Sequence, residues 1–169
     1  MRVDYHQVHP VAVGAMLGLE RAVHDGPLEA LVVELIKVRA SQLNGCAHCL
    51  EMHTKDARTL GESDDRLHLV AAWREAPGMF TEREQAALAW CEELTLLPET
   101  GASDAVYEEV RAQFSEEELV ALTLAIVAIN GWNRFAVGFR APVGGYTPRA
   151  QRREDPGRAG PQNGPAQDT

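Results

Sequence analysis

The chain has 169 residues, a formal net charge of −9 and only three cysteines. This length suits one domain with a substantial core. The negative charge argues against nucleic acid or an anionic membrane as a partner, so we expect a small molecule or another protein. The longest apolar stretch, from Leu119 to Ile129, is shorter than the ~20 residues of a membrane span, and no N-terminal apolar run follows a basic segment. We therefore expect a soluble, cytoplasmic protein.

The predicted elements are all helices. Apolar residues recur at helical spacing, and no stretch alternates at period two for long enough to predict a strand. Pro27 suits a first helical position, while Thr81 with Glu84 and Ser115 with Glu118 have the spacing of capping boxes. The fold class is therefore all-α, a helical bundle. In chain order, we expect helices near residues 12–24, 27–43, 46–60, 63–74, 81–97, 103–113 and 115–139.

The helix expected over residues 115–139 is apolar on nearly every side. Such a helix must be buried all round, which suggests either a central helix or a subunit interface with about equal weight. Cys91 lies in the helix expected over residues 81–97, beside Trp90, and we interpret it as a core residue rather than a third redox thiol.

Composition changes near residue 144. The segment from Thr147 to Thr169 has alanine as its only apolar residue type and is rich in proline, glycine and charge. Such a segment cannot bury enough surface to offset the entropy lost on ordering. We predict one folded domain over residues 1–143 and a disordered C-terminal tail over residues 144–169.

The stretch NGCAHCLEMH, residues 44–53, holds two of the three cysteines and two of the six histidines. We expect Asn44 and Gly45 to open a helix, which places Cys46 in its first turn. There the positive end of the helix dipole lowers the pKa of the thiol and makes it a nucleophile near neutral pH.

At ~100° per residue, Cys46, Cys49 and His53 fall on one face of this helix, while His48 points elsewhere. His53 lies one turn after Cys49 and can take its proton, and two thiols one turn apart can close into a disulfide. This spacing favours a working thiol pair. Two alternatives stay open: the set could bind zinc, although no fourth ligand with suitable spacing follows, or the cysteines could be buried as small hydrophobic residues.

Glu34 is a candidate proton acceptor and donor on the preceding helix. It lies at the edge of the apolar arc, flanked in space by Leu31 and Val38, where burial would raise the pKa of its carboxyl group. A solvated boundary glutamate is the commoner alternative. Arg39 lies near the middle of the same arc, and we expect it to form a structural ion pair.

The run ELIKVRASQLNGCAHCLEMHTKDARTLGE resembles the core motif of the carboxymuconolactone decarboxylase and alkyl hydroperoxidase D (AhpD)-like proteins. The matching pattern is a glutamate twelve residues before a Cys-x-His-Cys-x-x-x-His element, and the similarity extends from about Tyr5 to Pro142. The resemblance implies an AhpD-like helical bundle that assembles into trimers or hexamers. It also implies a peroxidase that works without metal, haem or another cofactor.

Residue by residue, the resemblance also implies catalytic roles. Cys49 matches the thiol that attacks the peroxide, Cys46 the thiol that closes the disulfide, Glu34 and His53 the proton relay, and His48 a further motif histidine. Dipole reasoning alone makes Cys46 the more acidic thiol. We follow the resemblance, because a base one turn from Cys49 can outweigh a dipole effect of ~0.3–1 kcal/mol.

We therefore expect a thiol-dependent peroxidase that reduces organic hydroperoxides. No flavin or nicotinamide motif appears, so its reductant is expected to be an external dithiol or a protein partner. One alternative is a cofactor-free decarboxylase or proton-transfer enzyme that uses His53 and Glu34, although such branches of the family generally lack the cysteine pair. Another is a redox-sensing module in which the disulfide only changes shape or assembly.

Overall fold

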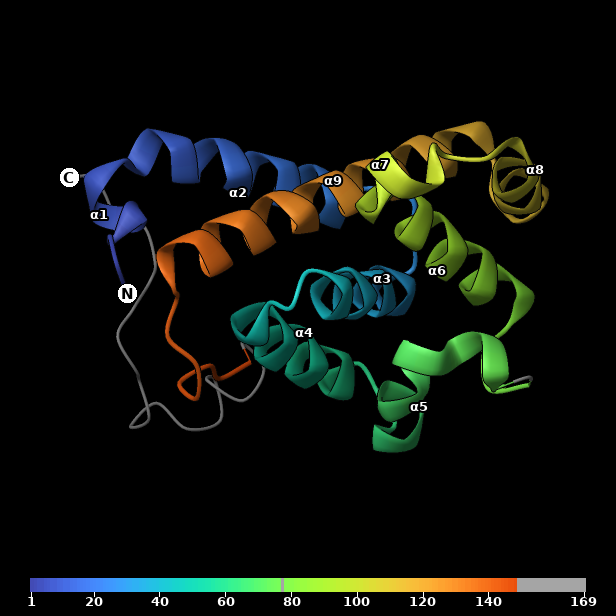
Figure 1. Ribbon diagram of the computed structural model, residues 1–169, viewed down its shortest axis with the longest axis horizontal. Helices are drawn as coiled ribbons and strands as arrows, with labels where there is room; N and C mark the ends of the chain where they lie inside the picture. Colours follow the sequence, from blue (N-terminus) through green and yellow to red (C-terminus); the bar gives the residue numbers. More distant parts are fainter. Residues whose placement is uncertain (77, 149–169) are drawn as a thin grey trace.

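The computed structural model describes residues 1–76 and 78–148 as a bundle of helices joined by short connections (Figure 1). These residues contain no β-strand, so the predicted all-α fold class is confirmed. The elements, in chain order, are α1 (Tyr5–Val8), α2 (Pro10–His24), α3 (Ala30–Leu43), α4 (Ala47–Thr59), α5 (Asp64–Leu69), the 3₁₀ helix η1 (Val70–Glu75), α6 (Glu82–Thr95), α7 (Leu97–Thr100), α8 (Asp104–Gln113) and α9 (Glu116–Phe139).

Both predicted capping boxes are confirmed. At α6 the Thr81 side chain accepts the backbone N–H of Glu84, whose carboxylate accepts the N–H of Thr81. Ser115 and Glu118 form the same reciprocal pair at α9. These local bonds satisfy backbone donors that have no partner within the helix, which fixes where each helix begins.

The predicted start of α3 at Pro27 is wrong. The helix begins at Ala30, because Glu29 keeps an extended backbone with φ −62° and ψ 130°. The Glu29 carboxylate binds Arg83 of α6 at 3.0 Å. The extended backbone of Glu29 is the non-helical conformation of an N-cap, so the first helical residue is Ala30.

The predicted start of α4 is also wrong in detail. Asn44 is the C-cap of α3, Gly45 takes a left-handed φ of +63°, and Cys46 is the N-cap of a helix that begins at Ala47. Glycine is favoured just past a helix end because it has no Cβ to clash in this conformation. The asparagine–glycine pair thus closes α3 instead of opening α4.

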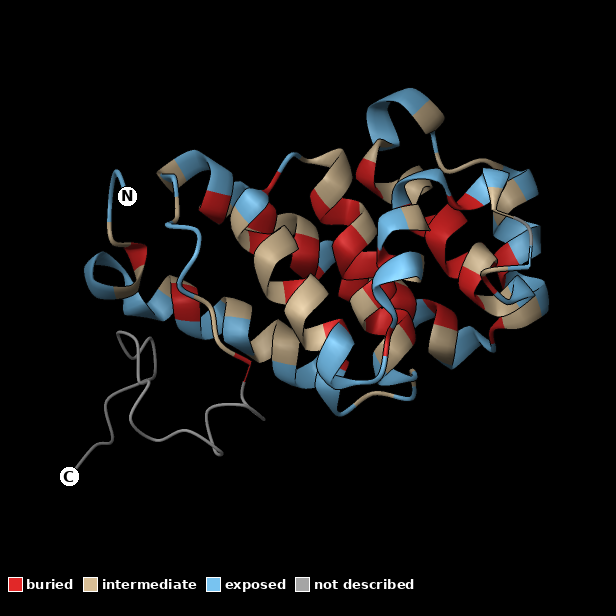
Figure 2. Cartoon of the chain, turned by 90° about the horizontal axis from the view of Figure 1, so that it is seen from below, coloured by how far each residue is buried: buried red, intermediate tan, exposed pale blue. Residues whose placement is uncertain are grey.

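The centre of the bundle is α3, which packs against α4, α6 and α9. In Figure 1, α2 and α9 lie side by side along the long axis of the molecule. Figure 2 shows that the buried residues gather on the inner faces of the central helices. Cys46 and Cys49, at the start of α4, belong to this core.

The expectation that α9 is buried all round is wrong within one chain. Ile126 and Ile129 are buried, whereas Val120 is 70% and Val127 53% exposed. By length and composition alone α9 could cross a membrane, but the core helices of soluble proteins meet the same criterion. In α9, 44% of the most apolar window is buried inside the domain. One face of α9 thus lies in the core and the other is uncovered.

Two residues interpreted as structural are confirmed in that role. Cys91 is fully buried and its Sγ donates to the carbonyl oxygen of Ile36 at 3.3 Å. Burial raises the pKa of its thiol to about 12. Arg39 binds Glu92 through two nitrogens, at 2.6 and 2.7 Å.

Most of the predicted tail, residues 149–169, lies outside the described residues. Its first residues return to α4. The Gly144 N–H donates to Glu51 Oε2 at 2.6 Å, and the Tyr146 hydroxyl donates to Asp56 at 2.8 Å. Contact with the helical domain therefore extends at least to Tyr146, past the predicted boundary at residue 143.

Candidate active site

The two motif cysteines meet at the start of α4. The Sγ of Cys46 accepts the backbone N–H of Cys49 at 3.4 Å. The two Sγ atoms are 2.7 Å apart, both thiols are free, and each residue is 1% exposed. Because an N-cap side chain turns toward the first helical turn, the three-residue spacing brings the sulfurs within reach of a disulfide.

The negative charge of this pair resides on Cys46. Its hydrogen bond with Cys49 lowers the pKa of Cys46 to about 6 against the opposing effect of burial, and the charge of His48 contributes. The pKa of Cys49 is raised, because its hydrogen bond with Cys46 and its burial both disfavour a second thiolate. The more acidic thiol is thus the one that dipole reasoning indicates, and the sulfur–sulfur hydrogen bond is the main cause. Attack by Cys49 stays a prediction.

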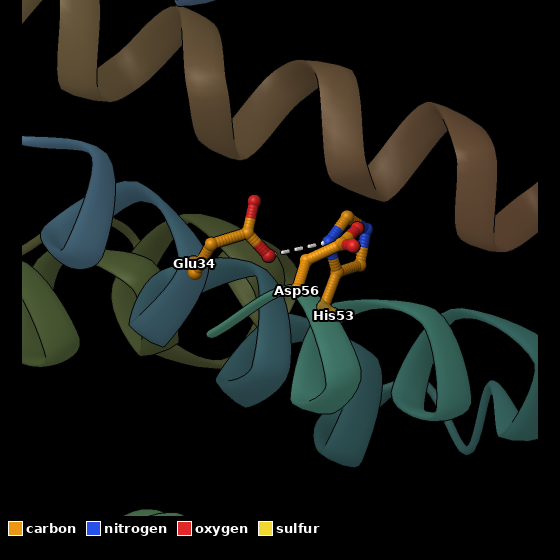
Figure 3. A group of neighbouring side chains, drawn as sticks. All are labelled: Glu34, His53 and Asp56. Atoms are coloured by element: carbon orange, nitrogen blue, oxygen red, sulfur yellow. Dashed lines mark hydrogen bonds and ion pairs between the residues drawn. The ribbon is translucent and has the colours of Figure 1, made fainter. Parts of the chain in front are cut away.

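Glu34 and His53 form the second part of the site. His53 is buried one turn after Cys49 on α4, and Glu34 projects toward it from α3 (Figure 3). His53 Nδ1 and Glu34 Oε2 lie 2.8 Å apart in a hydrogen bond. The two residues expected to form a relay are therefore in direct contact.

The predicted rise in the pKa of Glu34 is wrong. Burial does raise it, but the charge and hydrogen bond of His53 and the charge of Lys37 together outweigh burial, so the net pKa is lowered. Lys37 Nζ lies 4.0 Å from Glu34 and 2.7 Å from Glu20. Near neutral pH, Glu34 is an ionised carboxylate that can receive a proton through His53.

His48 does not join Glu34 and His53. Its Nδ1 lies 2.6 Å from the carbonyl oxygen of Pro142, on the segment that follows α9. The prediction that His48 points away from the cysteine face is confirmed. Its influence on the thiols is electrostatic, through the lowered pKa of Cys46.

Two residues beside the thiols were missed from the sequence. Asn133 of α9 is 1% exposed, donates to Ser41 Oγ at 3.1 Å, and lowers the pKa of both thiols by hydrogen bonding. An asparagine inside an apolar helix was the available signal. Burial raises the pKa of Tyr5, and negative charge on the motif cysteines raises it further. No local pattern marks Tyr5.

A second carboxylate, Asp56, lies beside Glu34 and His53. Among the described residues, these three are the group that could hold a metal ion, with potential ligand atoms within 4.8 Å of one another (Figure 3). Neither cysteine belongs to it, so it differs from the cysteine–histidine zinc set considered above. Glu34 and His53 are bound to each other, an arrangement suited to proton transfer. We call Glu34, His53 and Asp56 the relay cluster.

Comparison with known proteins agrees with this geometry. The model of the carboxymuconolactone decarboxylase family matches residues 10–93, which include Glu34 and the whole cysteine–histidine motif. The uncharacterized protein YdfG of Bacillus subtilis is 39% identical over 136 residues, 80% of this chain and 92% of YdfG.

Two solved structures share the fold. One, from Agrobacterium tumefaciens, is a protein of unknown function whose name relates it to the antioxidant defence protein AhpD. It is 47% identical, with a TM-score of 0.81 over 85% of this chain and 99% of that one. The debrominase Bmp8 is 18% identical, with a TM-score of 0.72 over 80% of this chain and 72% of its own. The chain therefore belongs to the carboxymuconolactone decarboxylase family and has an AhpD-like all-α fold.

Proposed function

We propose that this protein is a thiol-dependent peroxidase that reduces organic hydroperoxides through Cys46 and Cys49. The observation that carries the proposal is the pair of free sulfurs 2.7 Å apart, on the same helix as a buried histidine bound to Glu34. A pair of this kind supplies both a nucleophile and a resolving thiol, and the histidine–carboxylate contact supplies a proton relay.

The first step is attack by the Cys49 thiolate on the terminal oxygen of the hydroperoxide. Before the attack, the proton of the Cys49 thiol passes to His53 and Glu34. The S–O bond forms as the O–O bond breaks, the relay returns a proton to the departing alkoxide, and an alcohol leaves. Cys49 is then a sulfenic acid.

The second step closes the disulfide. Cys46 carries the resting negative charge of the pair and attacks the Cys49 sulfur, which releases water once the hydroxyl group is protonated. An external dithiol, free or on a protein partner, restores the two thiols by exchange and is itself oxidised to a disulfide. No metal or other cofactor takes part in this cycle.

A cavity of about 200 Å³ beside Glu34 has room for a small organic group. Glu20, His24, Glu34 and Lys37 line its polar part, its apolar walls include Val23, Leu28 and Val33, and neither motif cysteine lines it. A small alkyl group could rest on these walls while the peroxide end reaches toward the relay. We further propose that the protein acts in the cytoplasm as a homo-oligomer, a trimer or hexamer, in which the uncovered valines of α9 are buried.

The test is stopped-flow reaction of the reduced protein with cumene hydroperoxide. We expect the count of free thiols to fall from three to one, because Cys91 is buried away from the pair. In the matched control Cys91→Ser, the count should fall from two to zero at the same rate. A wild-type protein that reacts no faster than free cysteine would contradict the proposal.

A second experiment assigns the attacking thiol. A selective probe should trap sulfenic acid on Cys49 in the Cys46→Ser variant, where no resolving thiol is present. Trapping only in Cys49→Ser would reverse the two roles. If activity on a lactone substrate survives replacement of both cysteines, the site is instead a metal-free proton-transfer centre built on Glu34 and His53.

A further inference from the structure

Asp56 belongs to the relay cluster although the family motif noted above ends at His53. It lies three residues after His53 on α4, and Figure 3 shows it on the same side as His53 and Glu34. Groups within 4.8 Å of one another are close enough for the charge of each to change the protonation of the others.

Tyr146 holds the Asp56 carboxylate. Its hydroxyl lies 2.8 Å from each of the two carboxylate oxygens. A hydroxyl donates more strongly to an ionised carboxylate than to a neutral carboxyl group, so this contact favours the charged form.

The segment that carries Tyr146 is also bound to α4 at two residues that precede Asp56, namely Glu51 and Lys55. The Gly144 N–H donates to Glu51 Oε2 at 2.6 Å, and Lys55 Nζ donates to the Tyr146 carbonyl oxygen at 2.9 Å. The Tyr146 hydroxyl is therefore held over Asp56 by backbone contacts that do not depend on Asp56 itself.

Asp56 is surrounded by groups of both signs. Burial raises its pKa, the Tyr146 hydrogen bond lowers it, and the net pKa is raised. Without the hydroxyl, this carboxylate would take up a proton at a higher pH. The charged groups that face Asp56 are Glu34 and Lys37 from α3, His53 from α4 and, through Lys37, Glu20 from α2.

We propose that Asp56 and Tyr146 are positioning residues for the proton relay. Through its charge, Asp56 sets the pH range over which His53 and Glu34 exchange protons, and the Tyr146 hydroxyl holds that carboxylate in place and favours its charged form. The role in catalysis rests on the proposed peroxidase function, whereas the electrostatic role does not.

The test measures the midpoints of two pH titrations. One is the titration of His53, measured by NMR in protein with labelled histidine and assigned with His53→Gln. The other is the acid limb of thiol oxidation by cumene hydroperoxide. In Asp56→Asn, both midpoints should fall by roughly one pH unit, because protonated His53 loses a neighbouring negative charge. Asp56→Glu should restore them.

Tyr146→Phe should lower both midpoints by less than Asp56→Asn, because the carboxylate is still present and only protonates more readily. In the Asp56→Asn background, Tyr146→Phe should have no further effect. The matched control is Tyr107→Phe, at an exposed tyrosine of α8, and its midpoints should equal those of the wild type.

An unchanged His53 midpoint in Asp56→Asn that is folded by circular dichroism would overturn the proposal. So would an equal effect of Tyr146→Phe with and without Asp56. If the wild-type protein reacts no faster than free cysteine and the His53 midpoint still moves, the peroxidase function fails and the electrostatic role of Asp56 stands.

Discussion

Two partly buried ionic clusters in this protein use similar carboxylates for different ends. In the arginine cluster, Arg66 binds Glu62 at 2.8 Å and Glu84 at 2.6 Å and links α5 to α6. In the relay cluster, His53 binds Glu34 at 2.8 Å. The distances and burial are alike, so neither feature distinguishes a structural cluster from a reactive one.

The difference lies in which cation each cluster contains. Burial lowers the pKa of Arg66, but Glu62 and Glu84 more than compensate, so its guanidinium stays protonated at every physiological pH. Imidazole, by contrast, exchanges protons near neutral pH, and the thiol pair beside it shares one charge. A buried charge therefore indicates proton transfer only where a neighbouring group titrates in the working range.

The largest expected effect concerns the charge of Cys46. Its reactivity with iodoacetamide as a function of pH should have a midpoint of about 6, whereas an ordinary thiol has a pKa of ~8.5. In Cys49→Ala the midpoint should rise toward the ordinary value, because the sulfur–sulfur hydrogen bond is lost. A wild-type midpoint near ~8.5 would contradict the assignment.

The lowered pKa of Cys46 also makes the stability of the protein depend on pH. The pKa of Cys46 is lower in the folded state, so its contribution to stability is fully present above the pKa of the unfolded thiol. That contribution is lost as pH falls through about 6. The measurement is urea unfolding of the reduced protein at several pH values, with Cys46→Ser as the control that lacks this pH dependence.

The next effect tests the relay cluster. Glu34→Gln should slow thiol oxidation by roughly 100-fold, because the amide cannot accept a proton. Its unfolding free energy should change by only ~1 kcal/mol, since an amide can still hydrogen-bond to His53. Stopped-flow kinetics and urea unfolding give the two values. The matched control Glu84→Gln, in the arginine cluster, should lose unfolding free energy and keep the wild-type rate of thiol oxidation. The reverse pattern would contradict the different roles of the two clusters.

Arg66→Ala tests the arginine cluster directly. Removing the cation leaves two largely buried carboxylates without their partner, so the unfolding free energy should fall by roughly 3 kcal/mol. The pH profile of thiol oxidation in the folded variant should match that of the wild type. Urea unfolding and the rate profile measure the two effects. A shifted acid limb would mean that the two clusters are coupled.

The smallest expected effect is at Thr81. Thr81→Ala removes one half of the α6 capping box and should cost ~1 kcal/mol in urea unfolding. Glu84, the other half of the box, is still held by Arg66. Ser115→Ala makes the same change at α9, where Glu118 is bound by Arg83, and should cost a similar amount. A much larger loss of unfolding free energy in Thr81→Ala than in Ser115→Ala would show that the α6 cap also holds the arginine cluster in place.

Local spacing explains what could be predicted from the sequence. The capping boxes at Thr81 and Ser115 and the approach of Cys46 to Cys49 involve residues three apart, so backbone geometry alone brings them together. The Glu34–His53 contact joins two helices, and it was expected from the family resemblance rather than from periodicity. The role of Asn44 and Gly45 was misassigned because the same pair can close one helix or open the next.

The sequence by itself determined the all-α fold class, most helix positions and the motif that carries the thiols, since each depends on neighbours within about one helical turn. Only the tertiary structure decided the environment of those groups. The direction of the Glu34 pKa shift depends on Lys37 and His53 together, the thiols are influenced by Asn133 and Tyr5, and Asp56 is bound by a tyrosine ninety residues away. Charge–charge and hydrogen-bond energies depend on distance in space, which spacing along the chain does not fix.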